Sequence, residues 1–296
     1  MMPEQRSLTL VGLVLAASVI VLATYASTLG QAMHAWSSDL DYSHGFIVPL
    51  VALVYCWQKW PAISAQVFRN QSGGAVALGI GLIVLSAILH GAGMYLRILA
   101  VELFSLIVLL AGAVLVWCGV SAFRRLFPAF LFLLFMIPIP GQIIGPLRDR
   151  LQQTATSVSV FALQTTGIPA ASRGNVILLP DTEVGVAEAC SGLRILVSLA
   201  ALVSAIAMFI DRGPTEKFFL FASIIPIAIL INAGRIALVA ATAQYQPTWE
   251  HGVHDIAGMA MILVAIALIW LLLKFMDALL APSQPARPSP AARAVL

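Results

Sequence analysis

Long runs of apolar residues, separated by short polar segments, occupy most of this chain. A helix needs roughly 20 apolar residues to cross the hydrocarbon core of a bilayer, which is about 30 Å thick. The runs therefore predict an all-α polytopic membrane protein with about eight transmembrane helices. The expected spans are residues 8–28, 44–58, 74–92, 97–118, 124–140, 190–210, 217–242 and 256–280. The second and fifth spans are the least regular, because they contain Pro49 and Pro128.

The only sizeable polar segment, residues 141–189, lies between the fifth and sixth runs. From 143 to 163, polar and apolar residues alternate at roughly helical spacing, which predicts an amphipathic helix along the membrane interface. Two β-branched runs then flank Pro180 and Asp181, a pattern typical of a short hairpin. This hairpin is expected to lead directly into the sixth span.

Composition excludes two classes of protein. Hydrophobic residues make up 60% of the chain and charged residues only 10%, whereas a soluble domain carries roughly a quarter charged residues. The chain needs lipid as its solvent, so soluble enzymes and disordered proteins are excluded. The net charge of +3 is small and the basic residues are dispersed, so no nucleic-acid partner is expected. We predict one integral membrane domain over 1–280 and a disordered cytoplasmic tail, rich in Pro, Ser and Ala, over 281–296.

Lysine and arginine are distributed asymmetrically between alternate loops. The positive-inside rule places both termini in the cytoplasm and the loops 141–189 and 243–255 on the opposite, periplasmic side. The expected cytoplasmic segments then hold Arg6, Lys59, Arg69, Arg124, Arg125, Arg212, Lys217, Lys274, Arg287 and Arg293.

This topology brings three reactive residues to the outer face. Cys190 opens the sixth span, where free backbone N–H groups at a helix start favour a thiolate. Arg235 lies about 10 Å before Thr242, the end of the seventh span, from where its long side chain is expected to reach the interface and hold an oxyanion. His254 lies in the loop before the eighth span and is suited to proton transfer. The other cysteines, Cys56 and Cys118, lie inside apolar runs and are expected to be inert.

Each of these residues also has a structural interpretation. A membrane cysteine usually serves packing, an intramembrane arginine can pair with a buried acid, and a loop histidine is often simply solvated. The same choice applies to the neighbouring polar residues that we expect to support the site or bind substrate: Glu188, Ser191, Arg194, Asn232, His44 and His251, the last being a rival to His254. Elsewhere, Arg97 and Glu102 are expected to pair and His90 to be buried.

The local sequences resemble one known family. Glu188-Ala-Cys-Ser-Gly-Leu-Arg194, Asn232-Ala-Gly-Arg-Ile236 and His254-Asp-Ile-Ala-Gly258 are similar to motifs of the exosortase/archaeosortase family, in the same order. Asp41-Tyr-Ser-His-Gly45, before the second span, resembles the N-terminal region of bacterial exosortases. The resemblance extends from about Trp36 to Asp277. It implies a bacterial inner-membrane cysteine transpeptidase in which Cys190 is the nucleophile, Arg235 the catalytic arginine and His254 the catalytic histidine.

The family's substrates are exported proteins that end in a Pro-Glu-Pro motif, a transmembrane helix and a basic tail, often in connection with extracellular polysaccharide. Acyl transfer through a thioester to an unknown acceptor nucleophile needs neither a metal nor a cofactor, so we expect none. Two alternatives stay open. One is an intramembrane cysteine protease with water as the acceptor, and the other is a non-enzymatic transporter or polysaccharide-export subunit.

Overall fold

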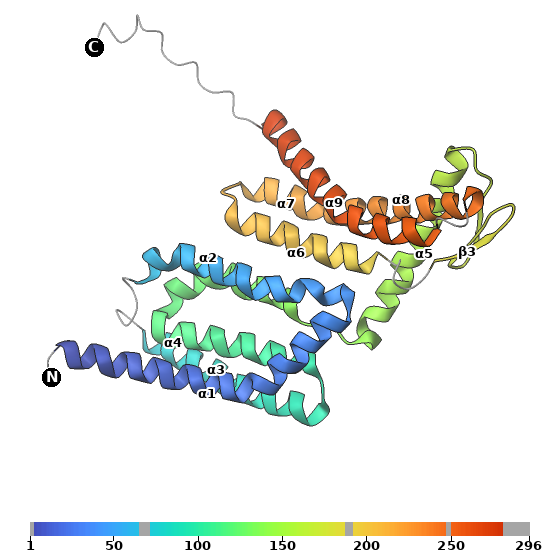
Figure 1. The fold of residues 1–296 in the computed structure, drawn as a ribbon. Helices are drawn as coiled ribbons and strands as arrows, with labels where there is room; N and C mark the ends of the chain where they lie inside the picture. Colours follow the sequence, from blue (N-terminus) through green and yellow to red (C-terminus); the bar gives the residue numbers. More distant parts are fainter. Residues whose placement is uncertain (1–2, 65–71, 187–191, 247–249, 281–296) are drawn as a thin grey trace, which may run out of the picture. The chain divides into compact units, whose positions relative to one another are not determined.

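A computed structural model describes the backbone of residues 3–64, 72–186, 192–246 and 250–280, and the side chains within these ranges except those of 3–18, 250–259 and 279–280. Within this part the chain is almost wholly helical, with one small sheet (Figure 1). The elements are α1 (Pro3–Ser38), η1 (Leu40–Phe46), α2 (Ile47–Ser64), α3 (Gly73–Leu96), α4 (Leu99–Leu133), η2 (Leu134–Met136), α5 (Gly141–Thr165), β1 (Ala171–Arg173), β2 (Val176–Leu178), β3 (Glu183–Gly185), α6 (Leu193–Phe209), α7 (Pro214–Ala222), α8 (Ile224–Tyr245) and α9 (Glu250–Leu280).

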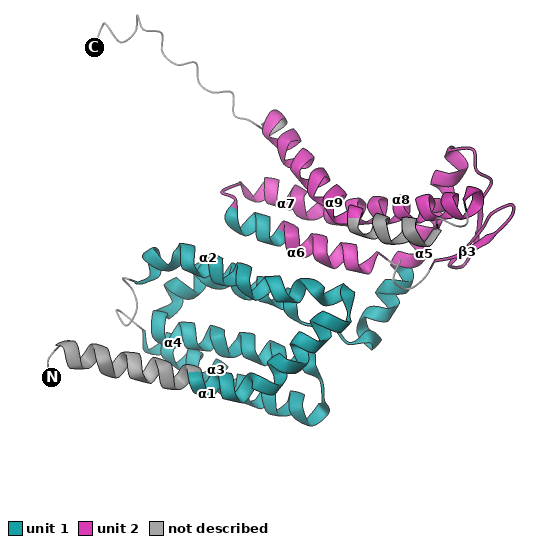
Figure 2. Ribbon diagram, viewed as in Figure 1, with its two compact units in different colours: residues 1–150, 204–209 teal, residues 151–203, 210–296 magenta. Residues whose placement is uncertain are grey.

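The helices confirm an all-α, multi-pass membrane protein. Five described segments are long and apolar enough to cross a bilayer: Leu40–Ser64, Gly73–Leu96, Leu99–Met136, Pro214–Tyr245 and Ala260–Ala278. A sixth apolar helix, Leu193–Phe209, is shorter. The expected first span lies within α1, and the tail expected to be disordered lies outside the described residues. The chain falls into two compact units, residues 1–150 with 204–209 and residues 151–203 with 210–296 (Figure 2).

In the first unit, two expected spans join into one helical segment that bends at Gly119. Gly119 has φ 76° and ψ −179°, a backbone conformation that glycine adopts without strain from a Cβ. Contacts on either side show that the chain reverses there. Glu102, early in α4, bonds to Thr28 of α1, and Met136, beyond the end of α4, accepts a hydrogen bond from Trp36 near the end of the same helix. The two expected spans, 97–118 and 124–140, therefore run in opposite directions within the first unit.

Buried polar groups join α1 to α3 and α4 in the first unit. The Thr28 hydroxyl donates to Glu102 Oε2 at 2.6 Å, and the Tyr25 hydroxyl lies 2.9 Å from Ser105 Oγ. The ring of His90, which is buried as expected, lies 4.3 Å from the Tyr25 ring. The expected pair between Arg97 and Glu102 is wrong: Arg97 ends α3 in a left-handed conformation, while the Glu102 carboxylate bonds to Thr28.

The Asp41-Tyr-Ser-His44 segment forms η1, a 3-10 turn that leads into α2. Its side chains hold η2 and the extended segment that follows it. Tyr42 accepts a hydrogen bond from the Ile139 N–H at 3.1 Å, and His44 Nε2 donates to the Phe135 carbonyl at 3.0 Å. Asp41 forms an ion pair with Arg148 of α5 at 3.4 Å. The segment thus ties the start of the second span to the chain that enters α5.

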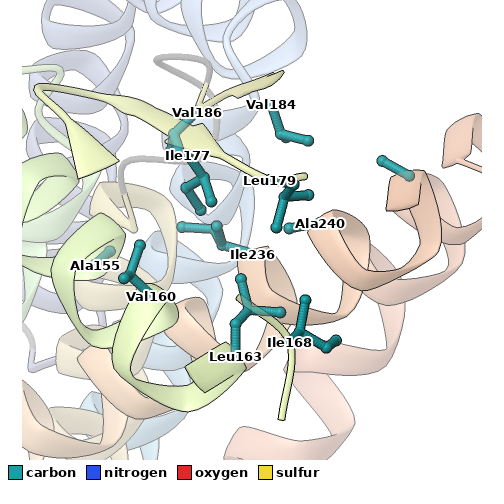
Figure 3. Packing of buried hydrophobic residues seen from close by; sticks show 11 residues of the cluster. Ala155, Val160, Leu163, Ile168, Ile177, Leu179, Val184, Val186, Ile236 and Ala240 are labelled. Carbon is teal, nitrogen blue, oxygen red and sulfur yellow. The ribbon is translucent and has the colours of Figure 1, made fainter. Parts of the chain in front are cut away.

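The second unit is organised around α8. The predicted amphipathic helix is confirmed as α5, and the predicted hairpin is confirmed as β2 and β3, which pair antiparallel with Ile177 opposite Val184. The strand β1, which pairs with β2, was not predicted because its three residues are all exposed and show no alternation. Apolar residues of α5, the sheet and the second half of α8 form one core (Figure 3): Ala155, Val160, Leu163, Ile168, Ile177, Leu179, Val184, Val186, Ile236, Ala240 and Ala243.

The expected seventh span is interrupted at Ser223, between α7 and α8. Pro226 is the physical cause, because a proline ring clashes with the carbonyl four residues earlier, here that of Ala222. Ser223 keeps helical angles, and its hydroxyl donates to the Leu220 carbonyl at 2.7 Å, so the chain continues into α8 after a short interruption.

Candidate functional site

Two polar residues of α8 are buried inside the second unit. Asn232 is 1% exposed and Arg235 is 8% exposed. They lie three residues apart and therefore share one face of the helix. The expected end of the span at Thr242 is corrected, and that Arg235 reaches the interface stays a prediction. The helix continues to Tyr245, so Arg235 lies about 15 Å before its end, and its side chain is covered by protein.

Asn232 contacts the start of α6. Gly192, the residue before α6, has φ 82°, and a Cβ built there would lie 2.9 Å from Asn232 Nδ2. Two of the motifs singled out in the sequence are thereby brought together, because Gly192 follows Cys190 and Ser191 while Asn232 precedes Arg235. Cys190, Ser191 and Glu188 themselves lie outside the described residues.

The strand that leads toward Cys190 is also fixed at its end. Val186 donates its backbone N–H to the Asn175 carbonyl at 2.8 Å, and its own carbonyl accepts a hydrogen bond from the Gln152 side-chain amide. Gln152 in turn accepts a hydrogen bond from the Asn175 side chain at 2.8 Å. Gln152 is 4% exposed, so this buried network satisfies its polar atoms with partners from the sheet.

The same helix that carries Gln152 also contacts α8. Ser159 is fully buried, and its hydroxyl lies 2.7 Å from the Ala155 carbonyl and 2.9 Å from the Ala233 carbonyl. Gln152 and Ser159 are seven residues apart, two turns along one face of α5. The sequence alone did not reveal either residue, because the pattern of 143–163 predicts only an amphipathic helix along the interface. Their recurrence at helical spacing among small apolar residues was the available signal.

The hairpin turn is tied to the far end of α8. The Gln244 side-chain N–H donates to Asp181 Oδ2 at 2.5 Å, and the Gln244 side-chain oxygen accepts a hydrogen bond from the Asp181 backbone N–H at 3.4 Å. The sheet therefore lies along α8, with its turn near Gln244 and Val186 packed in the same core as Ile236. The end of the sheet at Val186 therefore lies near the turn of α8 that holds Ile236, one residue beyond Arg235.

The remaining predicted site residues are placed as follows. Arg194 lies in the first turn of α6 and is partly buried. His44 lies in the first unit, where it bonds to Phe135. His251 and His254 lie within α9, which begins at Glu250, so the expectation that they lie in a loop is wrong. Hydropathy marks where a span enters the bilayer, whereas the helix begins earlier, with Glu250 favoured in its first turn. Their side chains lie outside the described set.

Across the described residues, no group of three or more His, Cys, Asp and Glu side chains is placed to hold a metal ion. In the described part of the second unit, the candidate site consists of a buried guanidinium and a carboxamide on α8, the carboxamide lying beside the start of α6. Such a buried polar site among membrane helices is typical of a function carried out at or within the bilayer.

Comparison with known families agrees with this architecture. The model of the family described as transmembrane exosortase matches residues 36–271, well over half of the chain. The protein therefore belongs to the transmembrane exosortase family, which is consistent with a role in processing the sorting signals of exported proteins. No curated protein and no solved structure was found to match the chain.

Proposed function

We propose that this protein is a membrane-embedded cysteine transpeptidase that cleaves the C-terminal sorting signal of exported proteins in the bacterial inner membrane. Both termini are cytoplasmic and the site faces the periplasm. Its catalytic residues are Cys190, Arg235 and His254. The substrates carry a Pro-Glu-Pro motif, a transmembrane helix and a basic tail, and their processing is linked to surface sorting and extracellular polysaccharide.

The observation that supports this proposal is the contact between Gly192 and Asn232. Two residues of chain span at most about 7 Å, so Cys190 lies within that distance of Gly192. Arg235 is one helical turn beyond Asn232, a rise of about 4.5 Å. These short distances support a site in which the Cys190 thiol and the buried guanidinium act together. Family membership supports the same assignment, since the matched range includes all three proposed catalytic residues.

The proposed reaction proceeds in two steps. The Cys190 thiolate attacks the scissile carbonyl, and Arg235 stabilises the negative charge on the oxygen. Collapse of the tetrahedral intermediate breaks the C–N bond, and His254 gives its proton to the leaving amine. The thioester that remains is attacked by the acceptor nucleophile, such as an amine, whose proton passes to the now neutral His254 as the new acyl bond forms and the thiolate leaves. If water is the acceptor, the product is a carboxylate.

Capture of the acyl-enzyme tests this proposal. A reporter protein that ends in a Pro-Glu-Pro motif, an apolar helix and a basic tail is coexpressed with the enzyme, and peptides attached to Cys190 are identified by mass spectrometry. We expect a thioester to Cys190, loss of processing in Cys190→Ala, and normal processing in Cys56→Ala and Cys118→Ala. Normal processing by folded Cys190→Ala enzyme would exclude a cysteine mechanism.

The same experiment identifies the acceptor. The mass of the released reporter distinguishes the two outcomes, because transfer leaves an adduct on the new C-terminus and hydrolysis leaves a free carboxylate. An adduct supports transpeptidation. A free carboxylate as the only product, with Cys190 still essential, makes the protein an intramembrane cysteine protease instead.

The domain assignment remains part of the proposal. Residues 1–280 would act as one integral membrane domain, with 141–189 as its periplasmic insert and 281–296 as a cytoplasmic tail. The contacts of α5 and the sheet with α8 support a functional insert, because they join it to the helix that carries Arg235.

A further inference from the structure

The buried face of α5 contacts both segments on which the proposed chemistry depends. Through Gln152, α5 holds the carbonyl of Val186, four residues before Cys190. Through Ser159, it lies 2.9 Å from the carbonyl of Ala233, two residues before Arg235. The two contacts are seven residues apart on one rigid helix, a rise of about 10 Å.

We propose that Gln152 is a positioning residue that, together with Ser159, fixes the distance between the segment carrying Cys190 and the helix carrying Arg235. The inference rests on the proposed function. Neither side chain is assigned a contact with substrate. Gln152 acts on the chain leading to Cys190, and Ser159 acts on α8.

Burial and connectivity favour Gln152 for this role. A glutamine that is 4% exposed needs partners for its amide, and both of its partners in the described structure belong to the insert: the Val186 carbonyl and the Asn175 side chain. Asn175 closes the network, because its own carbonyl accepts the Val186 N–H. Hydrogen bonds to the N–H and to the carbonyl of Val186 hold the peptide groups on both sides of this residue, which leaves its backbone little freedom to rotate. Such rigid support is what a reacting group needs from its surroundings.

Ser159 links the same helix to α8, which carries Arg235. Its hydroxyl is a polar contact between α5 and α8, and it meets α8 at the turn that holds Asn232 and Arg235. Apolar contacts surround it, since Ala155 and Leu163 of α5 pack in one core with Ile236 of α8. If α5 shifted, the chain at Val186 and the turn of α8 that carries Arg235 would therefore move relative to one another. Misplacement by about 1 Å costs on the order of a hundredfold in rate.

The chain offers matched controls for both residues. Gln153 and Ser157 lie on the exposed face of the same helix, so Gln153→Leu and Ser157→Ala remove the same groups without touching the sheet or α8. Gln152→Leu removes both hydrogen bonds of the amide. Gln152→Glu keeps the size and the acceptor for Asn175 but loses the donor to Val186, so it remains informative if the leucine variant fails to fold.

The experiment measures kcat and KM for the same reporter, and the rate at which iodoacetamide alkylates Cys190 as a function of pH, in enzyme that carries Cys56→Ala and Cys118→Ala. For Gln152→Leu and Gln152→Glu we expect kcat per folded enzyme to fall about tenfold to a hundredfold with KM nearly unchanged. We also expect a shifted pH profile of alkylation. Ser159→Ala should lower kcat less, and both control variants should behave like the wild type.

The outcomes separate the inference from the function on which it rests. Wild-type kcat and alkylation in folded Gln152→Leu and Gln152→Glu enzyme, while Cys190→Ala is inactive, would overturn the positioning role and leave the proposed function standing. Loss of folded enzyme alone, with kcat per folded molecule unchanged, would also overturn it. If Cys190→Ala still processes the reporter, the proposed function fails. The alkylation profile of the two Gln152 variants then decides by itself, and a profile like that of the wild type rejects the inference.

Discussion

Gly192 approaches Asn232 so closely that a Cβ on the glycine would lie 2.9 Å from the asparagine Nδ2 and 3.1 Å from its Cγ. Gly192 also has φ 82°, in the left-handed region that other residues avoid. Both facts require glycine at this position, because a side chain would strain the backbone and displace Asn232. The contact joins the segment after Cys190 to the turn of α8 before Arg235.

We expect Gly192→Ala to lower processing per folded enzyme by about tenfold or more, since the left-handed conformation alone costs about 1–2 kcal/mol and the close contact must also be relieved. Reporter cleavage, normalised to folded enzyme, measures this effect. Gly234→Ala is the matched control, because Gly234 lies in α8 beside the site with open space around it. The control should process normally, and equal activity in the two variants would contradict the role given to the contact.

Arg235 is expected to need its shape as well as its charge. A planar guanidinium donates two parallel hydrogen bonds to an oxyanion, which the point charge of lysine does less well. Losing one such donor costs on the order of a hundredfold. Arg235→Lys should therefore keep folded enzyme and lose most processing, and Arg235→Ala should lose more. If Arg235 serves only to balance a buried charge, the lysine variant will cleave the reporter at nearly the wild-type rate.

The hydrogen bond between Thr28 and Glu102 is predicted to stabilise the first unit. Glu102 is 3% exposed and accepts from Thr28 at 2.6 Å, so Thr28→Val would leave a buried carboxyl group without this donor. Such a loss costs about 1–3 kcal/mol. Thermal unfolding in detergent should show a lower Tm for Thr28→Val. Thr24→Val is the control: Thr24 is exposed one turn earlier and bonds only within its own helix, so an equal drop in Tm would refute the assignment.

The topology can be tested with exposed positions that the structure provides. Ser172 lies on the exposed strand β1 and Thr215 on an exposed position of α7. In a background lacking native cysteines, Ser172→Cys should react with a membrane-impermeant thiol reagent in spheroplasts. Thr215→Cys should react only after lysis. The reverse pattern would place the insert in the cytoplasm and remove the proposed periplasmic site.

Arg212, just before α7 on the expected cytoplasmic side, is a residue whose loop position the sequence predicts but whose partners it does not. It donates to Asp277 at 2.6 Å and to Glu216 at 3.0 Å. These hydrogen bonds raise the pKa of the Arg212 guanidinium further above its ordinary value. The sequence places Arg212 in a loop by hydropathy and charge, but its pairing with Asp277, far along the chain in α9, depends on how α7 and α9 pack.

The sequence by itself determined the class of protein, most helices and the hairpin. Long apolar runs have one stable arrangement in lipid, because a helix satisfies its own backbone hydrogen bonds. The alternation around Pro180 and Asp181 likewise determined β2 and β3 locally. The candidate motifs could also be recognised from the sequence, because they are defined by residue type and local spacing.

Only the tertiary structure decided which groups meet. Gln152 and Ser159 look like the polar face of an interfacial helix until the sheet and α8 are placed against them. Packing also decides that protein covers the Arg235 side chain, because the exposure of a side chain depends on what surrounds its helix. The meeting of Gly192 with Asn232 depends on contacts between segments forty residues apart, which hydropathy and local periodicity do not encode.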